Sequence, residues 1–373
     1  MNTASQKRVL ISGASFAGLS TAYWMNQFGY HVTVVEISPK LKQGGTPVDI
    51  MDGTIEIVKR MGLLEQIQSN QIKMESMEFK NATDITEKIN YREWNEDIEE
   101  VEYEVERDFL LQLLYDTVKD QTTFIFGDTI TGLIETDDQM EVSFKNGITQ
   151  NFDLVFGCDG IHSTVRKHWF GEEAEFVQFL NTYFSITIAD KLLIPENTTQ
   201  MYSEPGKTVM LNAYNNKTDI CLAFYAEQEI PYNYRDEQRM RSIILGEFKD
   251  TGWRTSELLA QVHNSTSFYF DKLCQVKMKS WTKGRVALVG DAGYCPSPAA
   301  GRGGSVAIDG AAALAAAFEK HNGDYDLAFQ EYNTSFRPFI EEIQAGVVEF
   351  GIDALIPRTE EAIQKRYEEG LGF

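Results

Sequence analysis

Residues 7–36 read KRVLISGASFAGLSTAYWMNQFGYHVTVVE, and this stretch decides the fold. Residues 7–12 form a mostly apolar run typical of a short buried strand, and the turn GASFAG follows at 13–18. A helical pattern then fills 19–28, and 31–36 form a second β-rich run. A strand, a turn, a helix and a strand within about thirty residues make one βαβ unit.

The turn resembles the dinucleotide fingerprint G-x-G-x-x-G, in which glycines allow a tight turn, close approach to a pyrophosphate and close packing of helix on strand. Gly13 and Gly18 fill the outer positions, and Ser15 replaces the middle glycine. Glu36 ends the second strand, where a carboxylate can accept both ribose hydroxyls of an adenosine and would repel a 2′-phosphate. A glycine turn alone is often structural, but the turn and the acid together predict binding of FAD or NAD.

Two later segments follow predicted buried strands. The first, at 158–166, reads CDGIHSTVR, and the second, at 284–292, reads GRVALVGDA and continues into YCPSPAAGRGGS at 294–305. Asp291 could bind a sugar or ribityl hydroxyl, and the glycine run could offer N–H groups to an electron-rich ring edge. Taken separately, each segment could also be an ordinary turn and a capped helix.

Length and composition limit the class of protein. The chain has 373 residues, of which 43% are hydrophobic and 24% charged, as in a soluble globular protein of two domains. Its net charge of −22 argues against a nucleic-acid or anionic-membrane surface. Four cysteines without a CxxC pair and five scattered histidines indicate neither disulfides nor a metal site. No apolar stretch approaches the roughly 18 residues that span a bilayer, so we expect a cytoplasmic protein.

The pattern along the chain predicts an α/β fold, in which a Rossmann-like nucleotide-binding domain carries an inserted β-rich substrate domain and ends in a C-terminal helix. A helix is expected at 49–62 and a last helix at about 359–367, which would brace both domains if the chain follows the family that it resembles below. The expected domains are 1–72, 101–175 and 279–335 for nucleotide binding, 73–100 and 176–278 for the β-rich domain, and 336–373 for the C-terminal helical segment.

The order of the motifs resembles one known family. Turn, acid, Arg107, the D-G segment and the G-D segment follow one another as in flavin-dependent aromatic hydroxylases of the para-hydroxybenzoate hydroxylase type, over about residues 7–335. Within that group the chain is similar to the tetracycline-inactivating monooxygenases. The shared features are a short chain, GGTPVD at 44–49 before a segment ending in MGLL at 61–64, and no added C-terminal domain.

The resemblance implies FAD as the bound cofactor and assigns it a set of residues. The pyrophosphate would lie on the turn, at Gly13, Ser15, Phe16, Ala17 and Gly18. Glu36 would bind the adenosine ribose, and Arg107 and Asp291 would bind the phosphate and ribityl region. Asp159 would have a shared structural and cofactor-binding role. Gly301, Gly303 and Gly304 would lie beside one edge of the flavin, and Gly45 and Asp49 beside the other edge. Pro298 would face the reactive side of the ring.

The chain departs from this family at the second glycine segment. Relatives usually read G-Q-G-x-N where this chain has GRGGS at 301–305. Loss of the asparagine removes a hydrogen-bonding group near the ring. Arg302 could add a positive charge there or point to solvent.

The resemblance also implies a mechanism, in which no side chain is assigned as catalytic. NAD(P)H reduces the flavin, O2 adds at C4a, and the resulting hydroperoxide hydroxylates an aromatic or enolic carbon, such as that of a tetracycline-like antibiotic. A second nucleotide fingerprint is missing, so NAD(P)H would dock transiently, with Lys40 and Lys42 as candidates for its phosphates or as plain surface lysines. Two alternatives are a reductase or dehydrogenase of the same fold without productive oxygenation and a non-catalytic FAD-binding protein. A halogenase is disfavoured because no W-x-W motif occurs.

The substrate is expected to meet aromatic side chains of the β-rich domain. The candidates are Phe184, Tyr202, Tyr214 and Phe224. A wall of aromatic rings suits a flat substrate, although the same residues could be sheet core. We expect a monomer or a weak homodimer.

Overall fold

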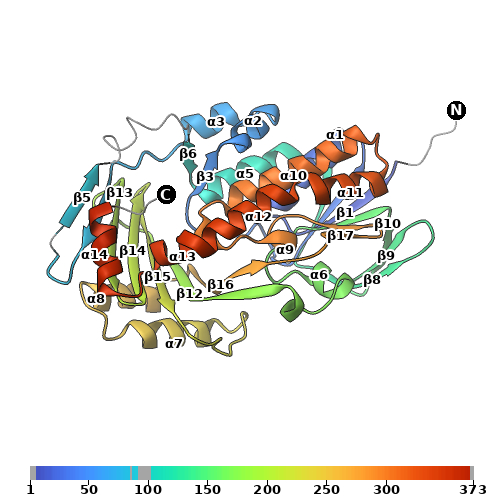
Figure 1. Cartoon of the computed structure of the whole chain (residues 1–373). Coiled ribbons are helices and arrows are strands. Elements are labelled where there is room, and N and C mark those ends of the chain that lie inside the picture. The colour runs from blue at the N-terminus through green and yellow to red at the C-terminus, as the bar shows by residue number, and fades with distance from the viewer. Residues whose placement is uncertain (1–5, 85, 91–101, 370–373) are drawn as a thin grey trace.

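The computed structural model describes residues 6–84, 86–90 and 102–369. Residues 85 and 91–100 of the first expected β-rich range therefore lie outside the described residues, as does residue 101. Figure 1 shows two lobes side by side, one built around a parallel sheet near the N-terminus and one around a larger antiparallel sheet. In the part of the chain that is described, no helix is both long and apolar enough to cross a bilayer.

A six-stranded sheet forms the centre of the first lobe, in the order β17-β18-β11-β1-β2-β7. All neighbours pair in parallel except β17. The central strands read as unbroken apolar runs because both faces of the sheet are covered. The strands are β1 (Arg8–Ser12), β2 (His31–Glu36), β7 (Thr122–Phe126), β11 (Leu154–Gly157), β17 (Thr282–Lys283) and β18 (Val286–Leu288).

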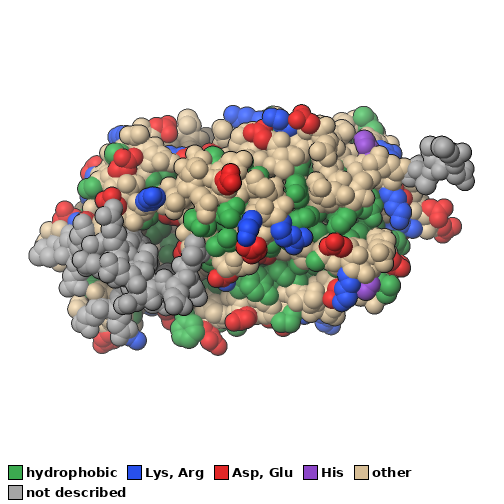
Figure 2. Space-filling view, turned by 90° about the horizontal axis from the view of Figure 1, so that it is seen from above, with side chains coloured by type: hydrophobic (Ala, Val, Ile, Leu, Met, Phe, Trp, Pro, Cys, Tyr) green, Lys and Arg blue, Asp and Glu red, His purple; other side chains and the backbone are tan. Residues whose placement is uncertain are grey.

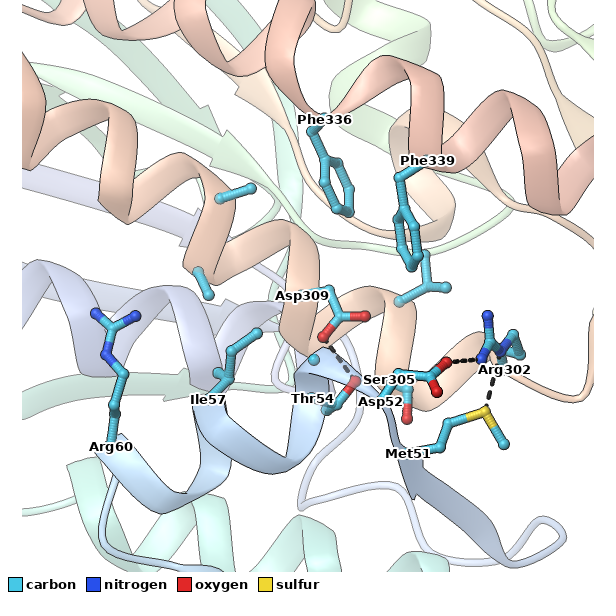
Figure 3. A pocket seen from close by; sticks show the side chains of 14 residues that line it. Met51, Asp52, Thr54, Ile57, Arg60, Arg302, Ser305, Asp309, Phe336 and Phe339 are labelled. Atoms are coloured by element: carbon cyan, nitrogen blue, oxygen red, sulfur yellow. Dashed lines mark hydrogen bonds and ion pairs between the residues drawn. The ribbon is translucent and has the colours of Figure 1, made fainter. Parts of the chain in front are cut away.

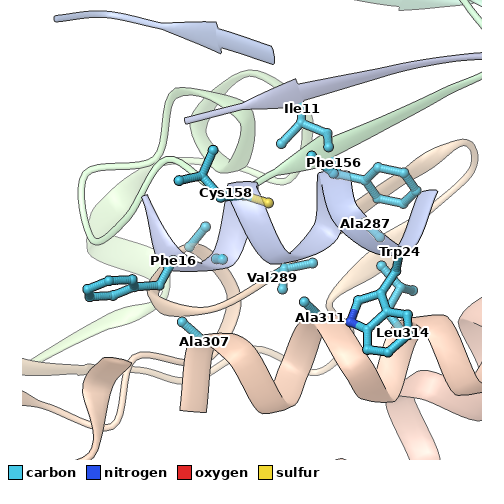
Figure 4. Close-up of a cluster of buried hydrophobic side chains, with 14 of the residues drawn as sticks. Ile11, Phe16, Trp24, Phe156, Cys158, Ala287, Val289, Ala307, Ala311 and Leu314 are labelled. Carbon is cyan, nitrogen blue, oxygen red and sulfur yellow. The ribbon is translucent and has the colours of Figure 1, made fainter. Parts of the chain in front are cut away.

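Three helices cover one face of this sheet, namely α1 (Phe16–Gln27), α5 (Arg107–Val118) and α10 (Gly303–Lys320). Small residues of α10, among them Ala307 and Ala311, let it approach α1 closely (Figure 4). A separate three-stranded meander packs into the same core. Its strands are β8 (Ile130–Glu135), β9 (Met140–Phe144) and β10 (Thr149–Phe152).

A two-stranded ribbon lies against α10 and corrects one expectation. β3 (Val48–Met51) pairs antiparallel with β6 (Glu102–Val105), and α2 begins only afterwards, at Gly53–Arg60. The predicted helix at 49–62 is therefore wrong at its start. Pairing with a strand about fifty residues away outweighs the local helical pattern, as tertiary contacts often do. A short helix, α3 (Leu64–Ser69), follows α2.

The second lobe is a seven-stranded sheet in the order β16-β12-β15-β14-β13-β4-β5. β4 joins it by pairing in parallel with β13, so two separate stretches of the chain form one sheet. Two helices that the sequence analysis did not predict, α7 (Glu237–Phe248) and α8 (Thr255–Asn264), cover its outer face. The strands are β4 (Ser76–Lys80), β5 (Thr86–Asn90), β12 (Val177–Ala189), β13 (Thr198–Glu204), β14 (Lys207–Tyr214), β15 (Lys217–Tyr225) and β16 (Phe268–Val276).

Helices at the end of the chain run along both lobes. α11 (Tyr325–Ser335) and α12 (Arg337–Gly346) pack on the first lobe, while α14 (Glu360–Glu369) contacts β13 of the second. Between them lie one π-helical turn, η3 (Val347–Gly351), and α13 (Ile352–Leu355). The predicted α/β fold with a Rossmann-like domain, additional β-structure and C-terminal helices is confirmed.

Candidate cofactor and substrate site

The first glycine turn lies at the end of β1 and touches the D-G segment. The amide of Gly13 donates to the carbonyl of Val35, 2.8 Å away, and its φ is +104°. A Cβ at Gly13 would lie 2.4 Å from the carbonyl oxygen of Cys158, so only glycine fits. The first two motifs of the sequence therefore meet at this edge of the sheet.

The N-terminus of α1 has the features of an anion site. Ser15 occupies the N-cap position, and within the described residues its side chain accepts no capping hydrogen bond. By contrast, Asp236 and Asp324 cap α7 and α11 with their carboxylates. The first amides of α1 are thus left for another acceptor, and the helix dipole favours a negative one. Phe16, Ala17 and Gly18 form the buried first turn.

Glu36 lies beside this turn. One oxygen of its carboxylate accepts from the amide of Ala14 and the other from the amide of Ser38, each at 2.9 Å. Each carboxylate oxygen can accept a second hydrogen bond, so the group can still take the hydroxyls of a ribose.

Arg107 brings a positive charge to the same turn. It is the first residue of α5, and its guanidinium donates to the hydroxyl of Ser15 at 3.4 Å and to the carbonyl of Gly44 at 3.0 Å. Burial lowers the pKa of Arg107, against the attraction of Asp108. Gly45 lies directly over this side chain, because a Cβ there would be 2.6 Å from Cδ of Arg107. Guanidinium and helix N-terminus together suit a diphosphate.

Asp159 holds the start of α6 (Thr164–Trp169). Its carboxylate accepts from the amide and hydroxyl of Thr164, at 2.9 and 2.8 Å, and from the hydroxyl of Ser12 at 3.3 Å. These bonds tie the D-G segment to β1. Asp159 thus holds the turn in place, whatever else it binds.

Asp291 begins α9 (Asp291–Tyr294), directly after the strand β18 and the loop that follows it. Burial raises the pKa of its carboxyl, against the attraction of Arg166. A Cβ at the preceding Gly290 would lie 3.0 Å from Cβ of Ala17. Asp291 therefore stands beside the first turn of α1.

The second glycine segment is open on one side and closed on the other. It comprises η2 (Pro298–Ala300) and the start of α10, whose N-cap residue Arg302 has a side chain that cannot accept from the first amides of the helix. Pro298, Gly301 and Gly303 are exposed, and a Cβ at either glycine would meet nothing within 4 Å. A Cβ at Gly304 would lie 2.4 Å from Val48. The open side fits a flat ring whose edge accepts from the amides of α10.

Ser305 and Arg302 connect this segment to β3. The hydroxyl of Ser305 donates to the carbonyl of Asp49. Arg302 forms an ion pair with Asp52 and donates to the sulfur of Met51 (Figure 3).

Figure 3 also shows the pocket that Arg302 lines, a cavity of about 340 Å³ between α2, α10 and α12. Phe336 and Phe339 point into it, and Asp309 accepts from the hydroxyl of Thr54 at 2.7 Å. Seen from the side of α2 and α10, hydrophobic side chains gather in the middle of the surface (Figure 2).

Three carboxyl groups meet where β3 and β6 face the second lobe. Burial and repulsion from Glu104 raise the pKa of Asp49 to about 8, and burial raises the pKa of Glu104 to about 7. Asp219 of β15, whose pKa burial also raises to about 7, accepts from the hydroxyl of Tyr214 at 2.9 Å. The sequence analysis singled out Asp49 and Tyr214 but missed Glu104 and Asp219, which only the strand pairing brings in.

The four aromatic candidates for the substrate wall do not share one surface. Phe184 faces the first lobe and packs with Leu273 and with Ala299 and Ala300 of η2. Tyr202 and Phe224 point to the opposite face, into the core that the sheet forms with α7 and α8. Phe184 remains in the proposed wall, whereas Tyr202, Phe224 and Tyr214 are all buried, and the hydroxyl of Tyr214 is bonded to Asp219.

The two candidate lysines also differ in position. Lys40 is exposed, whereas the ammonium of Lys42 lies 5.6 Å from the ring centre of Tyr269 in β16. Lys42 therefore stands at the boundary between the lobes, where the loop before β3 reaches the second sheet.

The family model of the FAD binding domain matches residues 6–343. The chain belongs to this family. A flavin-dependent monooxygenase of Legionella longbeachae is 33% identical over 90% of this chain and 87% of its own length. An uncharacterised protein of Mycobacterium tuberculosis is 34% identical over 91% and 92%, respectively. The chain is an FAD-dependent monooxygenase, as its resemblance to the aromatic hydroxylases predicted.

Solved structures lead to the same family. The crystal structure of tetracycline destructase Tet(51) superposes with a TM-score of 0.85 at 32% identity, covering 98% of this chain and 96% of that one. The structure of HpxO from Klebsiella pneumoniae with FAD and uric acid has a TM-score of 0.74 at 18% identity, which shows a shared fold.

Proposed function

We propose that this monooxygenase hydroxylates a polycyclic phenol or enol of the tetracycline type, with NAD(P)H as a transiently bound electron donor. One observation carries the proposal: the open face at Gly301 and Gly303 adjoins the apolar cluster of Phe184, Leu273 and Ala299 between the lobes. A flat substrate held there would lie next to the ring-binding segment. The similarity to Tet(51) supports the choice of substrate class.

The chain's residues would bind and orient the cofactor. The N-terminus of α1 and Arg107 hold the diphosphate, Glu36 the adenosine ribose and Asp291 the ribityl chain. The first amides of α10 donate to the ring edge, on the side of Gly303. When bound, FAD supplies hydride acceptance and activation of O2, and the surrounding apolar side chains exclude water. Asp159 keeps the D-G segment against the turn.

The test is a turnover measurement on the FAD-loaded enzyme. O2 uptake and NAD(P)H oxidation are followed with tetracycline and with simple phenols, using NADPH and NADH separately. We expect ligand-stimulated O2 uptake and a product heavier by one oxygen atom. Flavin reduction without an oxygenated product from any of these compounds would instead identify a reductase or dehydrogenase.

We further propose a cytoplasmic protein that is a monomer or a weak homodimer. All four cysteines are free, which suits a reducing compartment. Light scattering at several protein concentrations tests the oligomeric state, and a dimer that persists at nanomolar concentration would contradict it.

A further inference from the structure

A chain of hydrogen bonds runs from the D-G segment into the second sheet. Nδ1 of His162 lies 3.1 Å from Oε2 of Glu173, and Nε2 lies 3.1 Å from Oδ2 of Asp271 in β16. The hydroxyl of Tyr269 donates to the same oxygen of Asp271 at 3.3 Å, and the hydroxyl of Tyr232 donates to the other at 2.6 Å. Nothing in the cofactor-binding arrangement requires these groups to be linked.

The central imidazole carries a positive charge. Each ring nitrogen faces a carboxylate oxygen, so both must donate, which only the imidazolium can do. Burial alone would lower the pKa of His162, but Asp271 and Glu173 raise it to about 9. The ring also stacks on Tyr234 with centres 4.1 Å apart, a favourable place for a cation.

The charges around this group are balanced by neighbouring elements. Arg166 of α6 lies 4.0 Å from Glu173, and Lys272 of β16 pairs with Glu229 at 3.0 Å. His162 and Asp271 thus form one ion pair inside a wider set of carboxylates and basic groups.

The outer end of the chain meets a cavity of about 280 Å³, lined by His162, Glu173, Tyr232, Tyr234 and Lys272 among others. Charged side chains line part of it, and it is large enough for several waters. Protons can therefore reach the imidazole from solvent.

The inner end is Tyr269, which stands between the lobes. Its ring packs on Phe184 with centres 5.5 Å apart and lies under Lys42. Asp291 is close enough for its charge to raise the pKa of Tyr269, and Tyr269 is close enough to Arg107 to raise the pKa of that guanidinium. Burial and Asp271 raise the pKa of Tyr269, so the phenol stays protonated and is a donor.

We propose that His162, Asp271 and Tyr269 form a path that delivers a proton from the outer cavity to the compartment between the lobes. The proposal rests on the monooxygenase function, which needs such a delivery. NAD(P)H, one proton, O2 and the substrate give NAD(P)+, water and the hydroxylated product. One proton must therefore enter the enclosed site in each turnover.

The transfer changes only O–H and N–H bonds. The O–H bond of Tyr269 first rotates from Asp271 toward the compartment and releases its proton there. The phenolate then accepts a proton from the carboxyl of Asp271, which has accepted one from the imidazolium of His162. Water in the outer cavity then reprotonates His162. Every group returns to its starting state, and no oxidant other than O2 takes part.

The experiment uses the FAD-loaded enzyme, reduced with dithionite and mixed with O2 without substrate. Reoxidation of the anionic reduced flavin to give hydrogen peroxide also consumes one proton. Flavin absorbance and a pH indicator in weak buffer follow the two events. We expect Tyr269→Phe to slow both flavin reoxidation and proton uptake by about a hundredfold, the low end of general-acid contributions.

Tyr232→Phe is the matched control, because it also removes one phenol donor from Asp271 but lies on the side of the outer cavity. The rates of flavin reoxidation and proton uptake of this variant should stay within about twofold of the wild-type rates. Equal slowing of both variants, or of neither, overturns the path. A wild type that holds no FAD or does not react with O2 would contradict the proposed function instead.

A second measurement does not depend on turnover. NMR titration of the histidine side chains in the oxidised enzyme should show His162 titrating near pH 9 in the wild type and well below that in Asp271→Asn. The reoxidation rate of the wild type should fall above about pH 9, because the donor is then lost. A His162 that titrates near its ordinary value of about 6.5 contradicts the path, even if Asp271→Asn fails to fold.

Discussion

The guanidinium of Arg107 reaches the hydroxyl of Ser15, 3.4 Å away, and so joins the start of α5 to the turn that begins α1. Arg107 and Ser15 are 92 residues apart in the chain. Among the described groups, Arg107 has only one carboxylate within ion-pair distance, that of Asp108 at 3.9 Å. An anionic ligand would therefore stabilise this largely buried cation, whose carboxylate partner is distant.

We therefore expect Arg107→Gln to weaken FAD binding by about 10- to 100-fold, the equivalent of one charge-assisted hydrogen bond. Quenching of flavin fluorescence on titration of the apoprotein measures this. Arg239→Gln, at an exposed position of α7, should leave the affinity unchanged. Unaltered affinity in the Arg107 variant would show that the diphosphate lies elsewhere.

Substitutions at two neighbouring glycines should have different effects, one on cofactor binding and the other on packing. Gly303→Ala adds a methyl group that meets nothing within 4 Å, so the apoprotein should keep its melting temperature. If the flavin edge occupies that space, FAD affinity should fall by at least about tenfold. Gly304→Ala instead forces a methyl group to 2.4 Å from Val48 and should destabilise the apoprotein by about 1–3 kcal/mol.

Thermal melts of the two apoproteins and FAD titrations distinguish these effects. A Gly303→Ala variant that binds FAD as tightly as the wild type would mean that the ring does not approach this part of the segment.

The local motifs were readable from the sequence because each is continuous in the chain. The turn at Gly13, the acid at Glu36 and the start of α10 near Gly303 all depend on neighbours within a few residues. Their order along the chain also predicted the family. The fold class follows from the same βαβ pattern.

Pairing between segments that are distant in the chain could not be predicted from the sequence. β3 forms only because β6 lies beside it, and the same pairing sets Glu104 opposite Asp49. α7 was missed although Met240, Ile244 and Phe248 recur at helical spacing. Without that helix, nothing in the sequence tells which face of the second sheet is enclosed, and Tyr202 could not be assigned to a face.

Phe184 and Phe224 should therefore respond differently to truncation. Phe184→Ala removes a ring that faces the first lobe, so the apparent affinity for tetracycline should fall several-fold. Phe224→Ala leaves a cavity in the core beside Phe248 and should cost about 3–5 kcal/mol of stability.

The measurements are tetracycline-stimulated flavin reduction and urea unfolding. The substrate wall is misplaced if the Phe184 variant keeps the wild-type dependence on tetracycline concentration.

Asp49 makes stability depend on pH in a direction opposite to that of most carboxyl groups. Burial and the neighbouring Glu104 raise its pKa to about 8, against an ordinary value of about 3.9 for an unfolded chain. Between these two values the folded state binds more protons than the unfolded state. The contribution of Asp49 to stability therefore falls as the pH rises from about 4 to about 8.

Asp49→Asn removes this ionisation while keeping the shape of the side chain. At about pH 8.5 the variant should melt about 2 °C or more above the wild type, which corresponds to about 1 kcal/mol. Below about pH 4 the carboxyl is neutral in both the folded and the unfolded chain, so the difference should vanish there. Melts are recorded with saturating FAD, and Asp137→Asn, at an exposed position, serves as the control. A variant that is less stable at the higher pH would mean that Asp49 is ionised and held by hydrogen bonds, and that the carboxyl groups facing the second lobe do not share protons near neutral pH.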